Sequence, residues 1–204
     1  MRLVLASASP RRAELLRAAG FAFDTLAVDL DERAVPGESP EAHVRRLATE
    51  KSARAMEQLS GFSRTAGADG WTAVLGADTV VVVDGTILGK PGDDDEAESM
   101  LRQLSGRAHE VLTGVSIRLS DWHECRVGST TVELSRLTEA EVQWYVESGE
   151  GRDKAGAYAI QGLASRFIPR ITGSYSNVVG LPIAVVYELL GEIASRRGSG
   201  YPTR

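Results

Sequence analysis

A single carboxylate interrupts a strongly apolar part of the chain. Asp78 stands between residues 73–77 and 80–83, whose composition predicts a buried strand. A carboxylate in such a strand is costly unless a cation, a metal ion or hydrogen-bond donors lie beside it. The small residues Gly76 and Ala77 leave room for a ligand to approach the backbone. We therefore favour a functional role for Asp78 over the alternative, an aspartate at a strand edge or bulge.

Two arginines stand where a helix alone does not favour them. Arg11 and Arg12 fall in the first turn of a predicted helix, where the helix dipole disfavours a cation. A phosphate bound to the free backbone N–H groups and to the Ser7 and Ser9 hydroxyls would reverse that preference. The alternative is that both guanidinium groups face solvent or pair with acids elsewhere.

A lysine lies on the apolar side of the next predicted helix. At about 100° per residue, Lys51 falls within roughly 20° of Val44, in the middle of an apolar stripe. The ammonium group therefore faces inward. It either extends along its own stem to the protein edge or reaches a cleft and holds the charge of a ligand.

Further charged residues lie near these positions in the sequence. Lys90 follows the predicted hairpin that contains Asp78, and Asp29, Asp31 and Glu32 form an acidic cluster before the second helix. Such a cluster is usually a solvated loop, and by itself it is weak support for a metal site. Residues 85–91 are one residue short of a phosphate-binding loop.

The composition is that of an ordinary globular domain. The chain has 204 residues, of which 43% are hydrophobic and 25% charged, and its formal net charge is −5. The negative charge argues against general binding to nucleic acid or to an anionic membrane surface. Cys125 is the only cysteine, and residues 3–6 are too short for a signal-peptide core. We expect a cytoplasmic protein without a membrane span.

Apolar periodicity and end signals predict a mixed α/β fold. Strands are expected at 3–6, 73–83, 86–88, 111–119 (half-buried) and 126–134, with a two-residue turn at 84–85 and a loop at 60–72. Helices are expected at 10–19, from 40 to about 59, from the acidic start at 93–96 to a stop at Gly106, at 139–147 with a capping box between Thr138 and Glu141, and from Pro182 onward. The last helix is expected to turn Ile183, Val186, Tyr187, Leu190 and Ile193 inward, and residues 196–204 to form a polar tail.

Nine short sequence blocks stand out along the chain: LASASPRR at 5–12, DLDE at 29–32, EK at 50–51, GADT at 76–79, GKP at 89–91, LSGR at 104–107, DKAGAY at 153–158, IQG at 160–162 and GLP at 180–182. Together these blocks resemble the Maf family, and they occur in the family's order from Leu3 to about Ile193. The resemblance implies a single pyrophosphatase domain over residues 1–195, with an elongated inosine-triphosphatase-like α/β fold and a cleft between two lobes.

The resemblance also implies roles for particular residues. Asp78 matches the family's catalytic proton acceptor, and Glu32 matches a second acid that, with Asp78, holds a divalent metal ion, Mg²⁺ or Mn²⁺. The matches to phosphate-contacting positions are Ser7, Arg12, Lys51 and Lys90, and the matches to specificity positions are Arg11, Thr79 and Gln161. The latter three are similar to the subgroup that acts on dTTP and UTP.

The implied activity is hydrolysis of a nucleoside triphosphate between its α- and β-phosphates, by a protein that is often a homodimer. One alternative is a nucleotide-binding regulator of cell division. Such a protein needs cations that hold phosphates, but it does not need a buried acid beside them. Another is the inosine or xanthosine triphosphatase of a sister family, which a substrate panel would distinguish. Calorimetric binding of UTP without turnover would favour the regulator.

Overall fold

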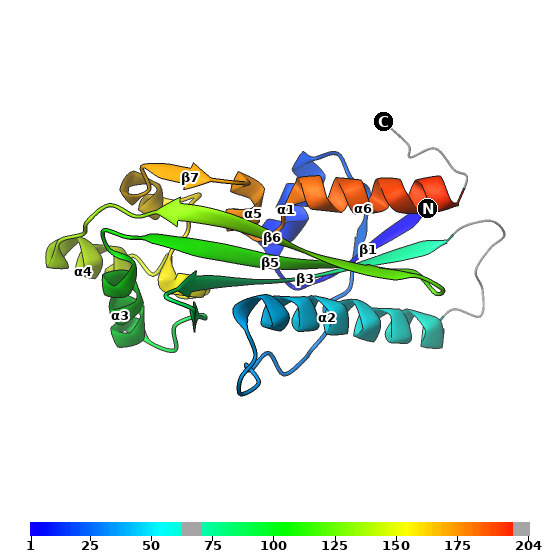
Figure 1. The fold of residues 1–204 in the computed structure, drawn as a ribbon, viewed down its shortest axis with the longest axis horizontal. Helices are drawn as coiled ribbons and strands as arrows, with labels where there is room; N and C mark the ends of the chain where they lie inside the picture. Colours follow the sequence, from blue (N-terminus) through cyan, green and yellow to red (C-terminus); the bar gives the residue numbers. More distant parts are fainter. Residues whose placement is uncertain (63–70, 198–204) are drawn as a thin grey trace. The chain divides into compact units, whose positions relative to one another are not determined.

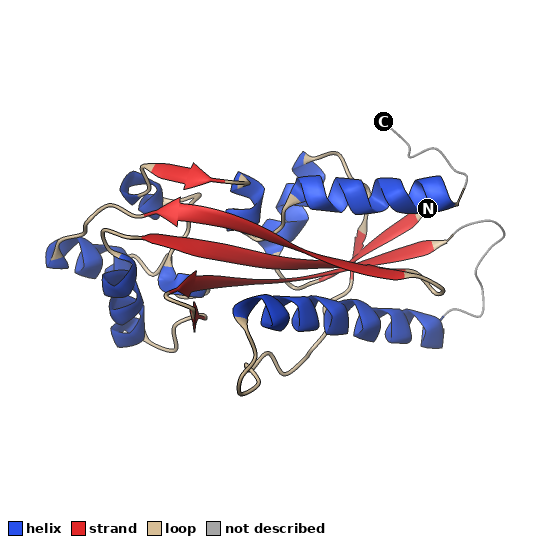
Figure 2. Cartoon of the chain, viewed as in Figure 1, coloured by secondary structure: helices blue, strands red, loops and turns tan. Residues whose placement is uncertain are grey.

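The structure is a computed structural model that describes residues 1–62 and 71–197. It confirms the predicted mixed α/β class (Figures 1 and 2). Most predicted elements are present within a few residues. Their bounds are β1 (Arg2–Ala6), α1 (Pro10–Ala18), β2 (Asp24–Thr25), α2 (Pro40–Phe62), β3 (Thr72–Val83), β4 (Thr86–Leu88), α3 (Asp94–Leu104), β5 (Ala108–Arg118), β6 (His123–Glu133), α4 (Glu139–Glu147), the 3-10 helices η1 (Ala155–Ala157) and η2 (Leu163–Phe167), β7 (Arg170–Thr172), α5 (Tyr175–Val179) and α6 (Ile183–Arg196).

The chain divides into two compact units. The first comprises Met1–Asp78, Thr113–Gly128 and Gly180–Arg204, and the second comprises Thr79–Leu112 and Ser129–Val179. The strands follow the order β2-β1-β3-β5-β6-β7, with β4 paired to β3. Because β3, β5 and β6 cross the boundaries between these segments, each of them contributes residues to both units.

The first unit has helices on both faces of its strands. Strand β1 pairs in parallel with β3, with Leu5 opposite Leu75 and Ala6 opposite Gly76. Alternate residues of these strands point to opposite faces. One set packs against α1 and α6, and the other packs against α2, as the ribbon in Figure 1 also shows. The first set includes Leu3, Leu5, Ala73, Leu75 and Ala77, and the second Val4, Ala6 and Val74.

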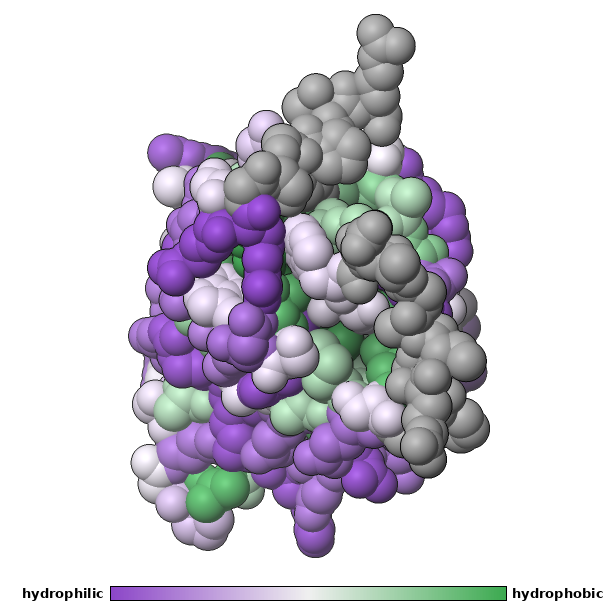
Figure 3. Space-filling view, turned by 90° about the vertical axis from the view of Figure 1, so that its right-hand side faces the viewer, coloured by the Kyte–Doolittle hydropathy of each residue, from purple (hydrophilic) through white to green (hydrophobic). Residues whose placement is uncertain are grey.

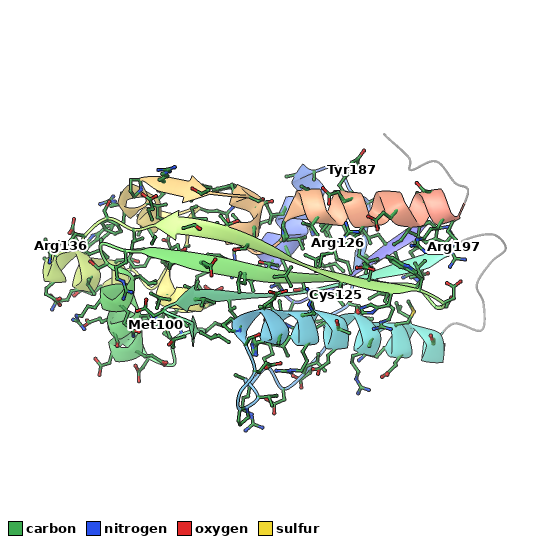
Figure 4. The ribbon with its side chains drawn as sticks, viewed as in Figure 1. Met100, Cys125, Arg126, Arg136, Tyr187 and Arg197 are labelled. Carbon is green, nitrogen blue, oxygen red and sulfur yellow. The ribbon has the colours of Figure 1, made fainter. Side chains whose placement is uncertain are left out.

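Two predictions about buried faces in this unit are wrong. Residues 113–117 of β5 are all buried, whereas a half-buried strand was expected, because α2 covers the face that carries Gly114 and Ser116. On α6, Tyr187 is 55% exposed, and Leu189 is fully buried instead. In Figure 4, Tyr187 lies on the side of α6 that faces away from the strands.

An ion pair also joins β6 to α6: Arg126 of β6 pairs with Glu192 of α6 at 2.5 Å.

Two predicted irregular segments are shorter than expected. Helix α2 continues through residues 60–62, and Thr72 already belongs to β3, so part of the predicted 60–72 loop is wrong. Helix α6 extends to Arg196, the first residue of the predicted polar tail. Residues 63–70 and 198–204, which make up most of these two segments, lie outside the described residues.

Short sequence signals explain the β3–β4 turn and the start of α4 in the second unit. Asp84 and Gly85 both have positive φ, 50° and 76°, which is the backbone that a two-residue hairpin turn requires. Thr138 and Glu141 form the predicted capping box of α4. The core of the unit joins α3, α4 and η2 through Leu101, Leu104, Val142, Tyr145 and Phe167.

Figure 3 shows one face of the surface, coloured by hydropathy. Hydrophilic side chains are common on that face, and hydrophobic side chains show between them. Folded proteins always retain some exposed apolar area, so this pattern requires no partner. Within the described parts of the chain, no helix combines the length and the apolar composition that a membrane crossing requires.

Candidate active site

Lys51 joins the two carboxylates that the sequence analysis singled out. Its Nζ atom lies 2.7 Å from Asp78 Oδ1 and 2.5 Å from Glu32 Oε1. The side chains of Lys51 and Asp78 are only 9% and 10% exposed, whereas that of Glu32 is 50% exposed. The predicted inward orientation of Lys51 is confirmed, and the ammonium group ends in ion pairs rather than at the protein edge.

Two glycines let α2 lie close enough for this contact. A Cβ atom at Gly76 would lie 2.7 Å from Ser52 N, and one at Gly114 would lie 2.6 Å from the carbonyl carbon of Val44. Real Cβ atoms do not approach backbone atoms so closely. The backbone of α2 therefore rests directly on the backbones of β3 and β5, which brings Lys51 within reach of Asp78.

Arg12 lies on the buried side of α1. Its Nε atom donates to the Gly180 carbonyl oxygen at 2.8 Å, and Nη1 donates to Ser7 Oγ at 3.2 Å. Burial lowers the pKa of the Arg12 guanidinium, and the charges of Asp78 and Glu32 oppose that change. An arginine stays protonated at neutral pH even so. The cation therefore acts in the same electrostatic environment as the two carboxylates.

Ser7, rather than the N-cap residue, provides the side-chain contact at the start of α1. Ser9 is the N-cap residue, but its side chain makes no capping hydrogen bond. The Ser9 backbone N–H instead donates to Ser7 Oγ at 3.2 Å. Arg11, the neighbour of Arg12, is half-buried. Ser7 thus contacts both the first turn of α1 and the Arg12 guanidinium.

The acidic cluster before α2 does not act as one group. Glu32 pairs with Lys51, whereas Asp31 pairs with Arg33 at 2.5 Å. Hydrogen bonds from Arg33 lower the pKa of Asp31 to about 2. Only Glu32 of this segment therefore joins the Lys51 and Asp78 pair.

Three predicted residues belong to the second unit. Thr79 is half-buried in β3, Lys90 is exposed after β4, and Gln161 is exposed between η1 and η2. Their roles in phosphate contact and base specificity stay predictions.

Asp78 and Glu32 are the residues that could hold a divalent metal ion. No group of three or more His, Cys, Asp or Glu side chains in the described residues could hold one alone. Mg²⁺, however, is commonly bound by one or two carboxylates together with substrate phosphates. Both carboxylates contact Lys51 Nζ, so Asp78 Oδ1 and Glu32 Oε1 lie close to each other. This donor set fits a Mg²⁺ or Mn²⁺ ion that binds together with a phosphorylated ligand.

Sequence reasoning missed two parts of this arrangement. Gly180, the first residue of the GLP block, has φ of 128° and supplies the carbonyl that accepts from Arg12. The only sequence signal was the glycine itself. Beside Lys51, Ser52 Oγ lies 2.7 Å from Ser116 Oγ, which lies 2.9 Å from His123 Nε2. Nothing in the sequence indicated this partly buried polar chain between α2, β5 and β6.

Buried cations around a carboxylate pair, on an α/β scaffold, define a class of protein suited to binding phosphorylated ligands. The chain belongs to the Maf family: the family described as "Maf-like protein" matches residues 2–193. The resemblance seen in the nine sequence blocks is thereby confirmed.

Curated relatives are similar over nearly the whole chain. A dTTP/UTP pyrophosphatase of Symbiobacterium thermophilum is 48% identical over 98% of this chain and 95% of its own. The dTTP/UTP pyrophosphatase of Pseudoalteromonas atlantica is 45% identical over 94% of this chain and 97% of its own. The crystal structure of protein VC0702 from Vibrio cholerae aligns over 97% of this chain and 98% of that chain, with a TM-score of 0.44 and 13% identity. That likeness is too low to support an inference.

Proposed function

We propose that this protein is a nucleoside triphosphate pyrophosphatase that hydrolyses dTTP and UTP to the monophosphate and pyrophosphate. The observation that supports it most is the Lys51 ammonium group held between Asp78 and Glu32, with buried Arg12 in the same electrostatic environment. The names of the curated relatives give the substrate class.

In the proposed reaction, a water oxygen forms a bond to the α-phosphorus as the bond to the bridging oxygen breaks. Asp78 accepts the proton of the attacking water. Arg12, Lys51 and Lys90, with Ser7, contact the phosphates and stabilise the negative charge that develops on the pyrophosphate leaving group. When bound at Asp78 and Glu32, Mg²⁺ or Mn²⁺ would supply charge neutralisation and a lower pKa of bound water.

Arg11, Thr79 and Gln161 are the proposed specificity residues. The Gln161 amide can both donate and accept a hydrogen bond, as the edge of uracil or thymine requires. We also propose a cytoplasmic homodimer that binds neither nucleic acid nor membranes. The negative net charge of −5 is consistent with the last two points.

The test is a panel of canonical and modified nucleoside triphosphates with Mg²⁺, in which pyrophosphate and single phosphate are measured separately. In a folded Asp78→Asn variant we expect pyrophosphate release from dTTP and UTP to fall at least about a hundredfold. The matched control is Asp84→Asn, the same substitution at the exposed hairpin turn, where asparagine tolerates the positive φ of 50°.

Two results would contradict the proposal. One is near-normal pyrophosphate release by Asp78→Asn. The other is calorimetric binding of UTP by the wild-type protein without turnover, which supports the nucleotide-binding regulator instead. A preference for purine triphosphates would contradict the role given to Gln161.

A further inference from the structure

The short segment that contains Gln161 is fixed at both ends by two side chains, Tyr145 near the end of α4 and Glu150 in the turn that follows this helix. Before Gln161, the Ala159 backbone N–H donates to Tyr145 Oη at 3.0 Å. After it, the Leu163 N–H donates to Glu150 Oε1 at 2.9 Å, and the Ala164 N–H approaches Glu150 Oε2 at 3.4 Å. All of these residues belong to the second unit.

Tyr145 and Glu150 also hold each other. The Tyr145 hydroxyl donates to Glu150 Oε2 at 2.8 Å. Tyr145 is only 1% exposed, and burial, followed by the hydrogen bond to Glu150, raises the pKa of its hydroxyl. The hydroxyl therefore keeps its proton and remains a donor to Glu150 at neutral pH, while it accepts from Ala159.

Gly162, the residue directly after Gln161, lies against the same carboxylate. A Cβ atom at Gly162 would overlap Glu150 Oε1 and would lie 2.8 Å from Oε2. The carboxylate thus occupies the space of the missing side chain. Because it also accepts hydrogen bonds from three donors, it cannot move aside without losing them.

Glu150 has no role in the phosphate chemistry proposed above. Its carboxylate oxygens are directed at the backbone around Gln161, and the Gln161 side chain itself is exposed. An exposed amide recognises a base edge only if its backbone is held in place, because a free loop would lose the advantage of preorganisation.

We propose that Glu150, supported by Tyr145, is a positioning residue that holds Gln161 for recognition of the pyrimidine base. This inference rests on the proposed function, since it gives Gln161 a base to recognise. It predicts a defect limited to nucleotides and absent for ligands that have phosphates but no base.

The experiment compares UTP with tripolyphosphate, a probe that has phosphates but no base and that we expect to compete with UTP for the phosphate contacts. In Glu150→Ala we expect the KM for UTP to rise about tenfold, the size of one lost base contact, with kcat changed less. The inhibition constant of tripolyphosphate should stay within about twofold of wild type. Glu147→Ala, at an exposed position at the end of α4, is the matched control and should change neither value.

Further variants separate positioning from general damage. Glu150→Gln keeps one acceptor oxygen and should give an intermediate KM. Gly162→Ala displaces the carboxylate without removing it, so it should reproduce the KM defect, and it replaces Glu150→Ala if that variant does not fold. The double variant Gln161→Ala/Glu150→Ala should have a KM for UTP less than about twofold above that of Gln161→Ala alone, because both changes remove the same contact.

Equal losses for UTP and tripolyphosphate would overturn the inference, as would an unchanged KM in Glu150→Ala or a full effect in the Gln161→Ala background. Failure of the proposed function has a different signature, namely no pyrophosphate release by wild type. The same comparison would then be made with calorimetric dissociation constants of UTP and tripolyphosphate, and equal changes in the two would again overturn the inference.

Discussion

Lys51 and Asp78 form an ion pair that water hardly reaches. Nζ lies 2.7 Å from Oδ1, and each side chain is at most 10% exposed. Removing water from two charges is costly, so such a pair contributes little net stability, but breaking it leaves an uncompensated buried charge. The burial of each charged side chain is therefore tolerated only while its partner is present.

The first prediction concerns that dependence. We expect Lys51→Met to lower the free energy of unfolding by about 3 kcal/mol, because Asp78 is left buried and charged. The double variant Lys51→Met/Asp78→Asn should recover at least half of the loss, since it removes the second charge. Urea denaturation measures both. Arg54→Met, at an exposed position on the same helix, should cost much less, and a double variant less stable than Lys51→Met would contradict the prediction.

The second prediction concerns the close contact of α2 with the strands. Gly114→Ala should push α2 away from β5 and destabilise the protein by about 2 kcal/mol. It should also reduce pyrophosphate release, because Lys51 moves with the helix. Gly191→Ala, in α6 with nothing within 4 Å of a new Cβ, should be neutral or slightly stabilising. Thermal melting of both variants provides the comparison, and equal melting temperatures would refute the close-contact argument.

The third prediction concerns Arg12. Arg12→Lys retains the positive charge but cannot donate to both Gly180 and Ser7 in the fixed geometry of the guanidinium. We expect kcat/KM for UTP to fall about tenfold or more, as for a lost charge-assisted hydrogen bond. Arg17→Lys, an exposed position near the end of α1, is the control and should keep wild-type kinetics. If Arg12→Lys kept the wild-type kcat/KM for UTP, the positive charge of Arg12 would matter and its two hydrogen bonds would not.

The fourth prediction concerns pH. Burial lowers the pKa of His109 from 6.5 to about 4. Between these values the unfolded chain binds a proton that the folded protein does not. Above pH 6.5 His109 is neutral in both states and its titration does not affect stability; as the pH falls from 6.5 towards about 4, protonation of His109 in the unfolded chain increasingly favours unfolding.

The measurement is the difference in unfolding free energy between wild type and His109→Gln across this range. Glutamine does not titrate and can still hydrogen-bond to Tyr158, which lies 2.8 Å from His109 Nε2. We expect the variant to lose less stability than wild type below pH 6.5. Parallel curves for the two proteins would show that His109 does not contribute to the pH dependence.

Several features were predictable because they depend on residues close together in the chain. The Thr138–Glu141 capping box and the Asp84-Gly85 turn are examples, since each is formed within four residues. Amphipathic periodicity placed Lys51 on the inner side of α2, and the apolar surroundings marked Asp78 as unusual. By contrast, periodicity failed for Tyr187, which is exposed while Leu189 is buried, because the apolar face of α6 is broad and only packing decides which part of it is covered.

The amino-acid sequence by itself determined the mixed α/β class, most element positions, the family, and the residues whose chemistry was out of place. Tertiary structure alone decided the partners of those residues. Arg12 meets the Gly180 carbonyl across 168 positions, Glu32 rather than Asp31 reaches Lys51, and Glu150 holds the segment around Gln161. The physical reason is that local propensities act over a few residues, whereas such pairs form only after packing has brought distant backbones into contact.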